Sequence, residues 1–185
     1  MKRRGAGNIA RLGLIACVAV VLGYVDSLLP LPAIPGVKLG LANCALLYAL
    51  YFCDAGSAFL LMLLKVGLSG LLYGGVPAMA YSLAGGALSL AAMLLARRAK
   101  DLSVVGVSVT GALLHNIGQM AVACLVVESR ALLAYLPVLL VSAAVTGTLT
   151  GLAATYTMRA LEKARAHAKD AVPGDIPEET NENKP

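Results

Sequence analysis

The stretch VVGVSVTGALLHNIGQMAVACLVV, residues 104–127, decides the fold of this protein. It contains no aspartate, glutamate, lysine or arginine. A helix needs about 20 predominantly apolar residues to cross the hydrocarbon core of a bilayer, with a usual range of about 17–25. The stretch is therefore predicted to be a transmembrane helix, and its centre, HNIGQ, is unusually polar for one.

The rest of the chain has the same apolar character. Of its 185 residues, 59% are hydrophobic and 14% are charged, whereas about 25% of residues are charged in an ordinary soluble domain. Five further segments come near the length of a membrane span: residues 9–29, 39–53, 55–73, 78–96 and 132–158. The expected fold is an all-α integral membrane protein with about six transmembrane helices, which argues against a soluble enzyme.

Basic residues near the segment ends predict the orientation, because cytoplasmic loops carry an excess of lysine and arginine. Three clusters stand out: Lys2, Arg3, Arg4 and Arg11; Arg97, Arg98 and Lys100; Arg159, Lys163 and Arg165. Six crossings place all three on the same side of the membrane. Both termini are therefore expected in the cytoplasm, and the net charge of +5 reflects topology rather than nucleic-acid binding.

Three parts follow from these segments. Residues 1–8 form a basic cytoplasmic N-terminus, and residues 9–160 form the six-helix membrane domain. The apolar run after the basic start has no small-residue cleavage site, so a retained first helix is expected. Residues 161–185 form a polar tail, which is expected to be disordered because it cannot bury a core.

A proline-rich stretch, residues 30–36, separates the first two apolar segments and cannot be regular helix. The segment that follows, residues 39–53, is short for a membrane span. Irregular backbone at membrane depth is tolerated only where protein or a cavity surrounds it. The stretch is therefore expected to dip into the protein as a gate, formed by Pro30, Pro32, Pro35 and Gly36.

Lys65 lies midway along its apolar segment, where a charged side chain costs about 2.5–3.5 kcal/mol on insertion scales. We expect a bundle-facing cation that meets a substrate or an internal acid. The alternative is a structural pair or a lysine that snorkels to the interface. Asp26, near the outer end of the first segment, is the acid that could pair with Lys65 or with Lys38.

Polar residues on two other segments complete the expected site. Lys38 begins the second helix, where an interfacial lysine is ordinary, and Asn43 lies one turn deeper. His115 and Gln119 are four residues apart and share a helix face, with Asn116 beside them. These side chains either form a binding site or join helices by hydrogen bonds of about 0.6 kcal/mol each. We expect Lys65 and the His115/Gln119 face to line one cavity in the outer half of the bundle, closed by residues 30–36.

Several catalytic motifs are missing from the sequence. There is no Walker A motif, so the chain is not expected to hydrolyse ATP by itself, and there is no GxSxG or HExxH motif. The five aspartates are isolated, whereas prenyl-diphosphate chemistry usually relies on carboxylate clusters that hold Mg²⁺. The four cysteines lie in apolar runs without a CxxC pair. No catalytic residue, metal or cofactor is expected.

Four motifs together resemble the Gx transporter family, whose members are also described as heptaprenyl diphosphate synthase component I. They are PGVKLGLAN at residues 35–43, SLAGG at 82–86, HNIGQ at 115–119 and the Thr146-Gly147 region. The resemblance covers residues 9–158, and the first and third motifs are the most specific. Lys65 departs from the family, in which arginine is expected, so the charge is kept but the bidentate fork is lost.

This family is similar to the S components of energy-coupling-factor transporters. The resemblance implies a six-helix, S-component-like bundle in a bacterial plasma membrane that binds a vitamin-like molecule. It also implies partners, namely a transmembrane scaffold subunit and two ATPases. The cytoplasmic half of the first helix, with Ala6, Ala10 and Gly13, would dock on the scaffold.

The leading hypothesis is therefore a substrate-binding membrane transport protein for a small, anionic molecule. Its polar lining would be Lys38, Asn43, Lys65, His115, Asn116 and Gln119. One alternative is a non-catalytic membrane subunit that partners a soluble prenyl synthase in isoprenoid or quinone metabolism. Another is a membrane component of a flavin-linked extracellular electron-transfer system.

Overall fold

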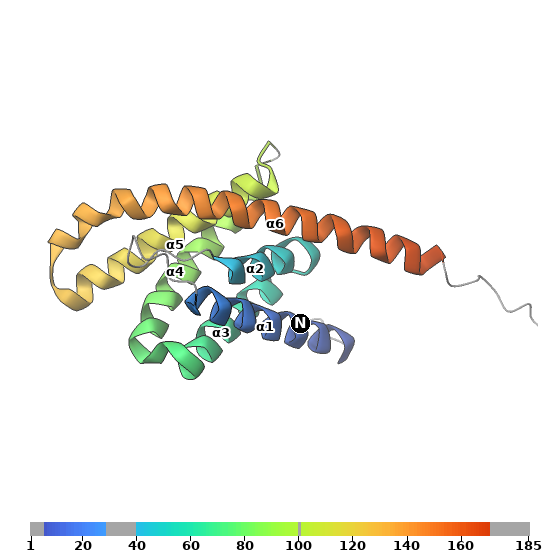
Figure 1. Ribbon diagram of the computed structural model, residues 1–185, viewed down its shortest axis with the longest axis horizontal. Helices are drawn as coiled ribbons and strands as arrows, with labels where there is room; N and C mark the ends of the chain where they lie inside the picture. Colours follow the sequence, from blue (N-terminus) through green and yellow to red (C-terminus); the bar gives the residue numbers. More distant parts are fainter. Residues whose placement is uncertain (1–5, 29–39, 100, 171–185) are drawn as a thin grey trace, which may run out of the picture.

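The computed structural model describes residues 6–28, 40–99 and 101–170, and within them every regular element is a helix (Figure 1). The all-α fold class is therefore confirmed. The elements are α1 (Ala6–Leu28), α2 (Leu41–Phe52), α3 (Ala55–Ser69), the π-helical turn η1 (Gly70–Gly74), α4 (Gly75–Ala96), α5 (Val104–Val127), the 3₁₀ turn η2 (Arg130–Tyr135) and α6 (Leu136–Asp170).

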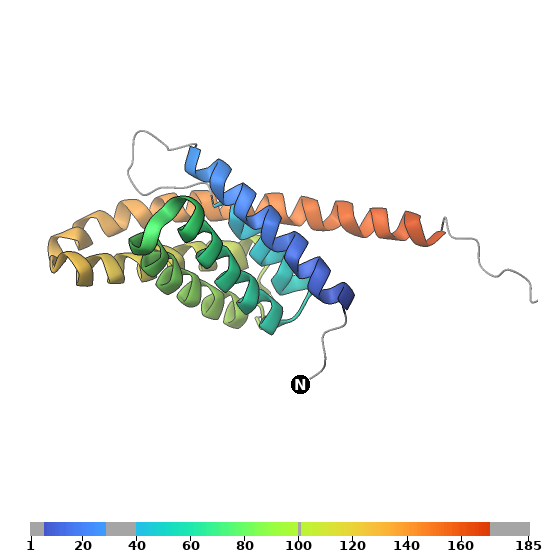
Figure 2. The same cartoon turned by 90° about the horizontal axis from the view of Figure 1, so that it is seen from below.

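The six α-helices run back and forth along the long axis of the molecule (Figures 1 and 2). Helices α3 and α4 form a hairpin, because Met62 packs against Gly86 and Met79 packs against Gly70. The reversal occurs where η1 meets Gly75, whose φ of 73° is a left-handed conformation that suits glycine. A turn thus separates the predicted segments 55–73 and 78–96, and α4 begins at Gly75 within it.

Four helical stretches of the described chain are long and apolar enough to cross a membrane: Ile9–Leu28, Ala55–Ala96, Val104–Val127 and Arg130–Ala164. The second of them contains the folded-back α3–α4 hairpin. Helix α2 is apolar but has only 12 residues, about 18 Å at 1.5 Å per residue. It is even shorter than the segment predicted from the sequence.

Helix α2 lies at the centre of the main hydrophobic core. Leu46, Leu47, Ala49 and Leu50 are each no more than 3% exposed, and they pack with buried residues from the neighbouring helices, including Leu61 of α3. A helix that is buried on most of its surface needs no polar face. Its position explains why so short an apolar segment is stable between longer ones.

Glycine brings α4, α5 and α6 into close contact. A Cβ atom on Gly118 of α5 would lie 2.8 Å from the Ala84 carbonyl oxygen of α4. A Cβ atom on Gly151 of α6 would lie 2.8 Å from the Val105 Cα of α5. Small residues allow this approach of backbones in membrane proteins, and here they make the three helices one closely packed layer.

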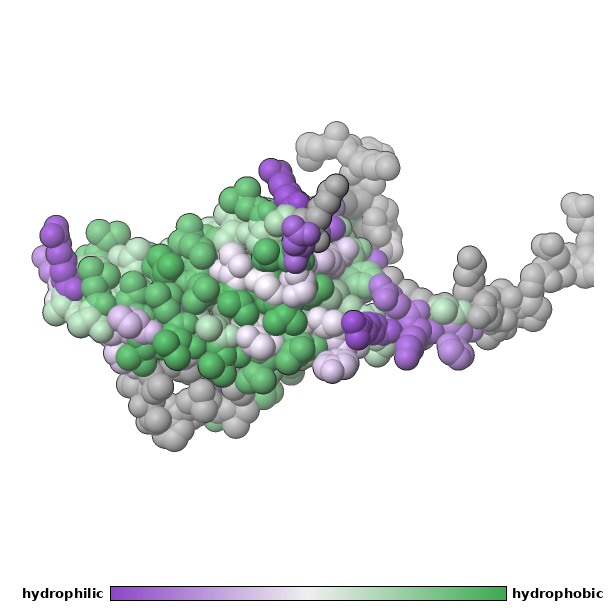
Figure 3. Space-filling view, turned by 90° about the horizontal axis from the view of Figure 1, so that it is seen from above, coloured by the Kyte–Doolittle hydropathy of each residue, from purple (hydrophilic) through white to green (hydrophobic). Residues whose placement is uncertain are grey.

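The surface matches a chain that lies in a bilayer. In the space-filling view, an apolar band covers the middle of the visible face, and hydrophilic residues gather toward its ends (Figure 3). Apolar side chains such as Leu14 and Leu71 are more than two-thirds exposed. Such large exposed apolar surfaces mark contact with a membrane or with another protein.

The C-terminal helix differs from the expectation. Helix α6 continues to Asp170, although residues 161–185 were expected to be a disordered tail. The sequence LEKARAHAK at residues 161–169 consists mostly of strong helix formers, so the helix continues beyond the bundle (Figure 1). Residues 171–185 lie outside the described part of the chain.

Candidate functional site

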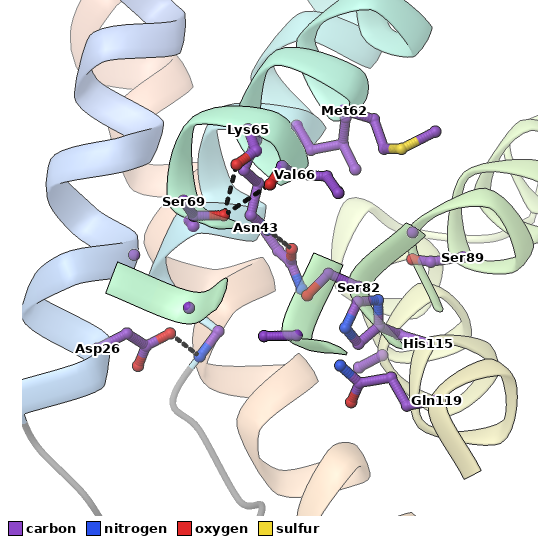
Figure 4. A pocket seen from close by; sticks show the side chains of 18 of the residues that line it. Asp26, Asn43, Met62, Lys65, Val66, Ser69, Ser82, Ser89, His115 and Gln119 are labelled. Carbon is purple, nitrogen blue, oxygen red and sulfur yellow. Dashed lines mark hydrogen bonds between the residues drawn. The ribbon is translucent and has the colours of Figure 1, made fainter. Parts of the chain in front are cut away.

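A cavity of about 360 Å³ lies between the helices, and side chains from all six of them line it (Figure 4). Its volume is within the usual range of about 300–1,000 Å³ for small-molecule pockets. Five of the six residues expected to bind a substrate are on its wall: Asn43, Lys65, His115, Asn116 and Gln119. The sixth, Lys38, lies outside the described residues.

Lys65 points into the bundle rather than toward the membrane interface. Its ammonium group donates a hydrogen bond to the Asn43 side-chain oxygen, with 2.7 Å between Nζ and Oδ1. One turn later, the Ser69 hydroxyl donates to the Lys65 carbonyl at 2.5 Å. The Lys65 side chain therefore joins α3 to α2 at the cavity wall, which fits both the predicted bundle-facing cation and the alternative of a structural pair.

Asp26 holds the N-terminus of α2. Its Oδ2 atom accepts hydrogen bonds from the backbone N–H groups of Gly40 at 2.8 Å and Leu41 at 3.1 Å. The side chain is 5% exposed. Its other oxygen, Oδ1, is buried and accepts no hydrogen bond from the described residues. The expected pairing with Lys38 cannot be followed, because Lys38 lies outside that part of the chain.

His115 and Gln119 of α5 share the face that lines the cavity, and both are seen on its wall in Figure 4. Gly85 of α4 makes room for them. A Cβ atom at position 85 would lie 2.8 Å from Gln119 Cγ and 3.0 Å from His115 Cε1. A residue without a side chain is therefore required where α4 crosses this face.

Asn116 has a structural role as well as a place on the cavity wall. Its side-chain nitrogen donates a hydrogen bond to the Leu139 carbonyl of α6 at 2.9 Å. Asn116 therefore joins two helices, and His115 and Gln119 line the cavity beside it.

Most hydroxyl groups on the wall do not stand out in the sequence. Seven such side chains line the cavity: Ser27, Ser69, Tyr73, Ser82, Ser89, Ser142 and Thr146. A single hydroxyl in a membrane helix carries little signal, because it usually bonds to a carbonyl three or four residues earlier. Ser142 does so with Leu139. Ser82 and Thr146 belong to stretches that carry the family resemblance, which was the available signal.

Tyr73 was missed for a different reason. It lies at the end of a predicted span, where tyrosine usually marks the membrane interface. In the structure it packs on Tyr24 of α1, with ring centroids 5.7 Å apart. A Cβ atom on Gly23 would lie 2.7 Å from the Tyr73 hydroxyl oxygen. Tyr73 thus connects η1 to α1 at the wall of the cavity.

The two accessory surfaces expected from the sequence are only partly described. The gate residues Pro30, Pro32, Pro35 and Gly36 lie outside the described residues. Ala6, Ala10 and Gly13 all belong to α1, and Ala10 and Gly13 are exposed. Nothing lies within 4 Å of a Cβ atom placed on Gly13, so this part of the α1 surface is open.

Metal-binding groups do not gather in the described part of the chain, where no cluster of three or more histidine, cysteine, aspartate or glutamate side chains occurs. At the cavity, Asp26 is accompanied by Lys65, amides, hydroxyls and His115. The arrangement can hold a small molecule by hydrogen bonds and by one charge of each sign.

Comparison with known proteins gives one match. The family model described as heptaprenyl diphosphate synthase component I matches residues 15–157. No curated protein and no solved structure matches the chain. The matched range contains all four motifs that carry the resemblance, and it covers most of the chain. The protein therefore belongs to the heptaprenyl diphosphate synthase component I family.

Proposed function

We propose that this protein is a membrane-embedded receptor that captures a small molecule for transport, energised by separate ATPase partners. The observation that carries the proposal is the cavity, in which Asn43, Lys65, His115 and Gln119 converge from three helices. Polar side chains inside a membrane domain are costly. Their convergence on a space of ligand size is the expected arrangement for a binding site.

The arrangement of helices supports six membrane crossings with both termini in the cytoplasm. Helices α3 and α4 are two antiparallel members of one long apolar stretch. The turn between α4 and α5 and the free end of α6 lie toward the same end of the molecule, away from η2 (Figure 1). Two basic clusters, around Arg97 and Arg159, therefore fall on one side, as the positive-inside rule requires.

Capture from outside requires a gate and a partner surface. The sequence predicts residues 30–36 as the gate, and these residues lie outside the described part of the chain. The open surface of α1 around Gly13 contacts a scaffold subunit, because small residues permit close approach of another helix. The chain itself supplies binding and no catalysis.

The family description favours a second function, in which the chain is a non-catalytic membrane partner of a soluble prenyl synthase. A third candidate, carried over from the resemblance, is a membrane component of a flavin-linked electron-transfer system. Purification of the chain from its native membranes distinguishes these functions. ATPases and a scaffold subunit support transport, a prenyl synthase supports the second function, and flavoproteins support the third.

Substitution of Lys65 tests whether the cavity binds a ligand. The Lys65→Met variant keeps the length of the side chain and removes its charge. We expect wild-type protein purified in mild detergent to carry a small molecule, and the variant to carry at most about one-tenth as much. The bound compound is measured by mass spectrometry of a solvent extract.

Lys163→Met is the matched control, because Lys163 is exposed on α6 and is not on the cavity wall. This control should retain the wild-type amount of ligand. Circular dichroism should show the same helix content in all three proteins. Equal ligand occupancy in the wild type and a folded Lys65→Met variant would refute the proposed role of the cavity.

A further inference from the structure

The N-terminus of α2 faces the cavity, and an aspartate of the same chain already occupies it. The N-terminal end of a helix carries a partial positive charge and free N–H groups, and it is therefore a common binding site for phosphate and other anions. Here the Asp26 carboxylate accepts the N–H groups of Gly40 and Leu41. An anionic ligand would have to displace this carboxylate to use them.

The cavity offers little further positive charge to a ligand. Among the described residues on its wall, Lys65 is the only lysine or arginine and Asp26 is the only carboxylate. Lys65 donates one hydrogen bond to Asn43. The opposite wall contributes the Ser82 hydroxyl, the Gln119 amide and the His115 imidazole (Figure 4).

A diphosphate has different requirements. Proteins hold phosphate groups with several charge-assisted hydrogen bonds from arginine or lysine, or with Mg²⁺ held by carboxylates. A buried carboxylate beside such a ligand repels it, since charges a few ångströms apart interact strongly where water is partly excluded. Among the described residues of the wall, Lys65 is the only lysine or arginine that can offset this repulsion.

We infer that this cavity takes a ligand with no more than one negative charge, either neutral, zwitterionic or singly anionic, and excludes allylic diphosphates. The inference rests on the proposed function, because it names the class of molecule that the receptor binds. If the substrate is anionic, as the sequence predicts, it carries a single negative group, and that group faces Lys65. Heptaprenyl diphosphate, the product that the family description names, is therefore not expected to bind in this cavity.

The experiment uses the full chain in lipid nanodiscs and geranyl diphosphate with Mg²⁺ as the probe. Native mass spectrometry measures the bound fraction across a titration of wild type, Asp26→Asn and Lys65→Met. Asparagine can still accept a capping hydrogen bond but carries no charge. We expect the affinity of the cavity for the probe to rise at least about tenfold in Asp26→Asn. Wild type should show no more binding than Lys65→Met.

Asp54→Asn is the matched control. Asp54 also caps a helix, because it accepts a hydrogen bond from Ser57 N at 2.8 Å, but it is exposed and is not on the cavity wall. It should leave binding of the probe at the wild-type level. Saturable binding to wild type that depends on Lys65, or no gain in Asp26→Asn, would overturn the inference.

The natural ligand gives a second readout. A compound that co-purifies with wild type in a Lys65-dependent manner should have a net charge of zero or −1 at pH 7. A diphosphate found there would refute the inference and still support the receptor. Protein that carries no Lys65-dependent ligand would instead contradict the proposed function, while the titration would still report the charge preference of the cavity.

Discussion

The two halves of the bundle are held together in different ways. Helices α4, α5 and α6 meet through glycines, so that Gly118 and Gly151 bring backbone against backbone. Helices α1, α2 and α3 are joined by longer side chains. Asp26 reaches the N-terminus of α2, and Lys65 reaches Asn43. The cavity lies between these two halves.

The difference indicates which wall can adjust to a ligand. Backbone contacts at glycine leave no room for a helix to shift without loss of packing. A hydrogen bond between side chains can exchange its partner for a ligand group at little net cost, since such bonds are worth about 0.6 kcal/mol in membrane proteins. We therefore expect the α4–α6 half to stay fixed and the α1–α3 half to move when the cavity fills.

The largest effect should follow from a side chain inserted between α4 and α5. In Gly118→Leu, the new atoms would collide with the Ala84 backbone of α4. Overpacking of this kind costs about 1–3 kcal/mol and occasionally more, and we expect at least the upper value because backbone cannot yield as a side chain does. Thermal unfolding in detergent, followed by circular dichroism, measures the loss.

Gly67→Leu is the control for that substitution. Gly67 lies on α3, and nothing is within 4 Å of a Cβ atom placed on it. The unfolding temperature of this variant should match or exceed that of wild type, because glycine weakens a helix. Similar losses of thermal stability in both variants would show that the two halves of the bundle tolerate an added side chain equally well.

Two neighbouring glycines of α4 provide the next test. A Cβ atom on Gly85 would meet the His115 carbonyl oxygen and Gln119 Cγ, each at 2.8 Å. One on Gly86 would meet the flexible Met62 side chain, at 3.1 Å from Cγ and 3.2 Å from Sδ, and Val66 Cγ2 at 4.0 Å. Gly85→Ala should lower stability by about 1–3 kcal/mol and should displace His115 and Gln119.

The amount of ligand that co-purifies should therefore be about tenfold lower in Gly85→Ala than in wild type. Gly86→Ala should lose less than about 1 kcal/mol, because methionine adapts to irregular space. Gly86 itself lines the cavity, but its added methyl group should lower the ligand content less than displacement of His115 and Gln119 does. Extraction and mass spectrometry, with circular dichroism for folding, measure both variants. If Gly86→Ala lost the ligand and Gly85→Ala did not, the wall that cannot shift would be the one at α3 rather than the α4–α6 half.

The smallest effect concerns the other end of α2. Arg97, the C-cap residue of α4, donates to the Leu50 carbonyl and lies 5.1 Å from the centroid of the Tyr51 ring. Loss of a cation–π contact and a hydrogen bond from an exposed arginine costs about 1 kcal/mol. Arg97→Met should lower the unfolding free energy by that amount, whereas Arg98→Met, its exposed neighbour, should not. Equal effects would remove the reason to treat Arg97 as an anchor of α2.

The sequence by itself was enough to predict the membrane fold and most helix boundaries. The segment predicted at residues 104–127 is α5, Val104–Val127, in the structure. Polar residues end the apolar run on each side, and Ser103 caps the helix by accepting from Gly106 N at 3.2 Å. Length and apolar character identify a span because both are local properties. Low hydrophobicity predicted disorder from residue 161 onward. Residues 161–170 are nevertheless helical, because their helix propensity is high.

Which helices touch, and which polar groups meet, was decided by the tertiary structure. The polar residues of α2, α3 and α5 were identified from the cost of polar groups in lipid, which is also local. The hydrogen bond between Lys65 and Asn43 depends on how α3 packs against α2. The partner of Asp26 could not be found from sequence at all, because it accepts from backbone N–H groups. Nearly every residue carries such a donor, and only packing determines which of them a buried carboxylate reaches.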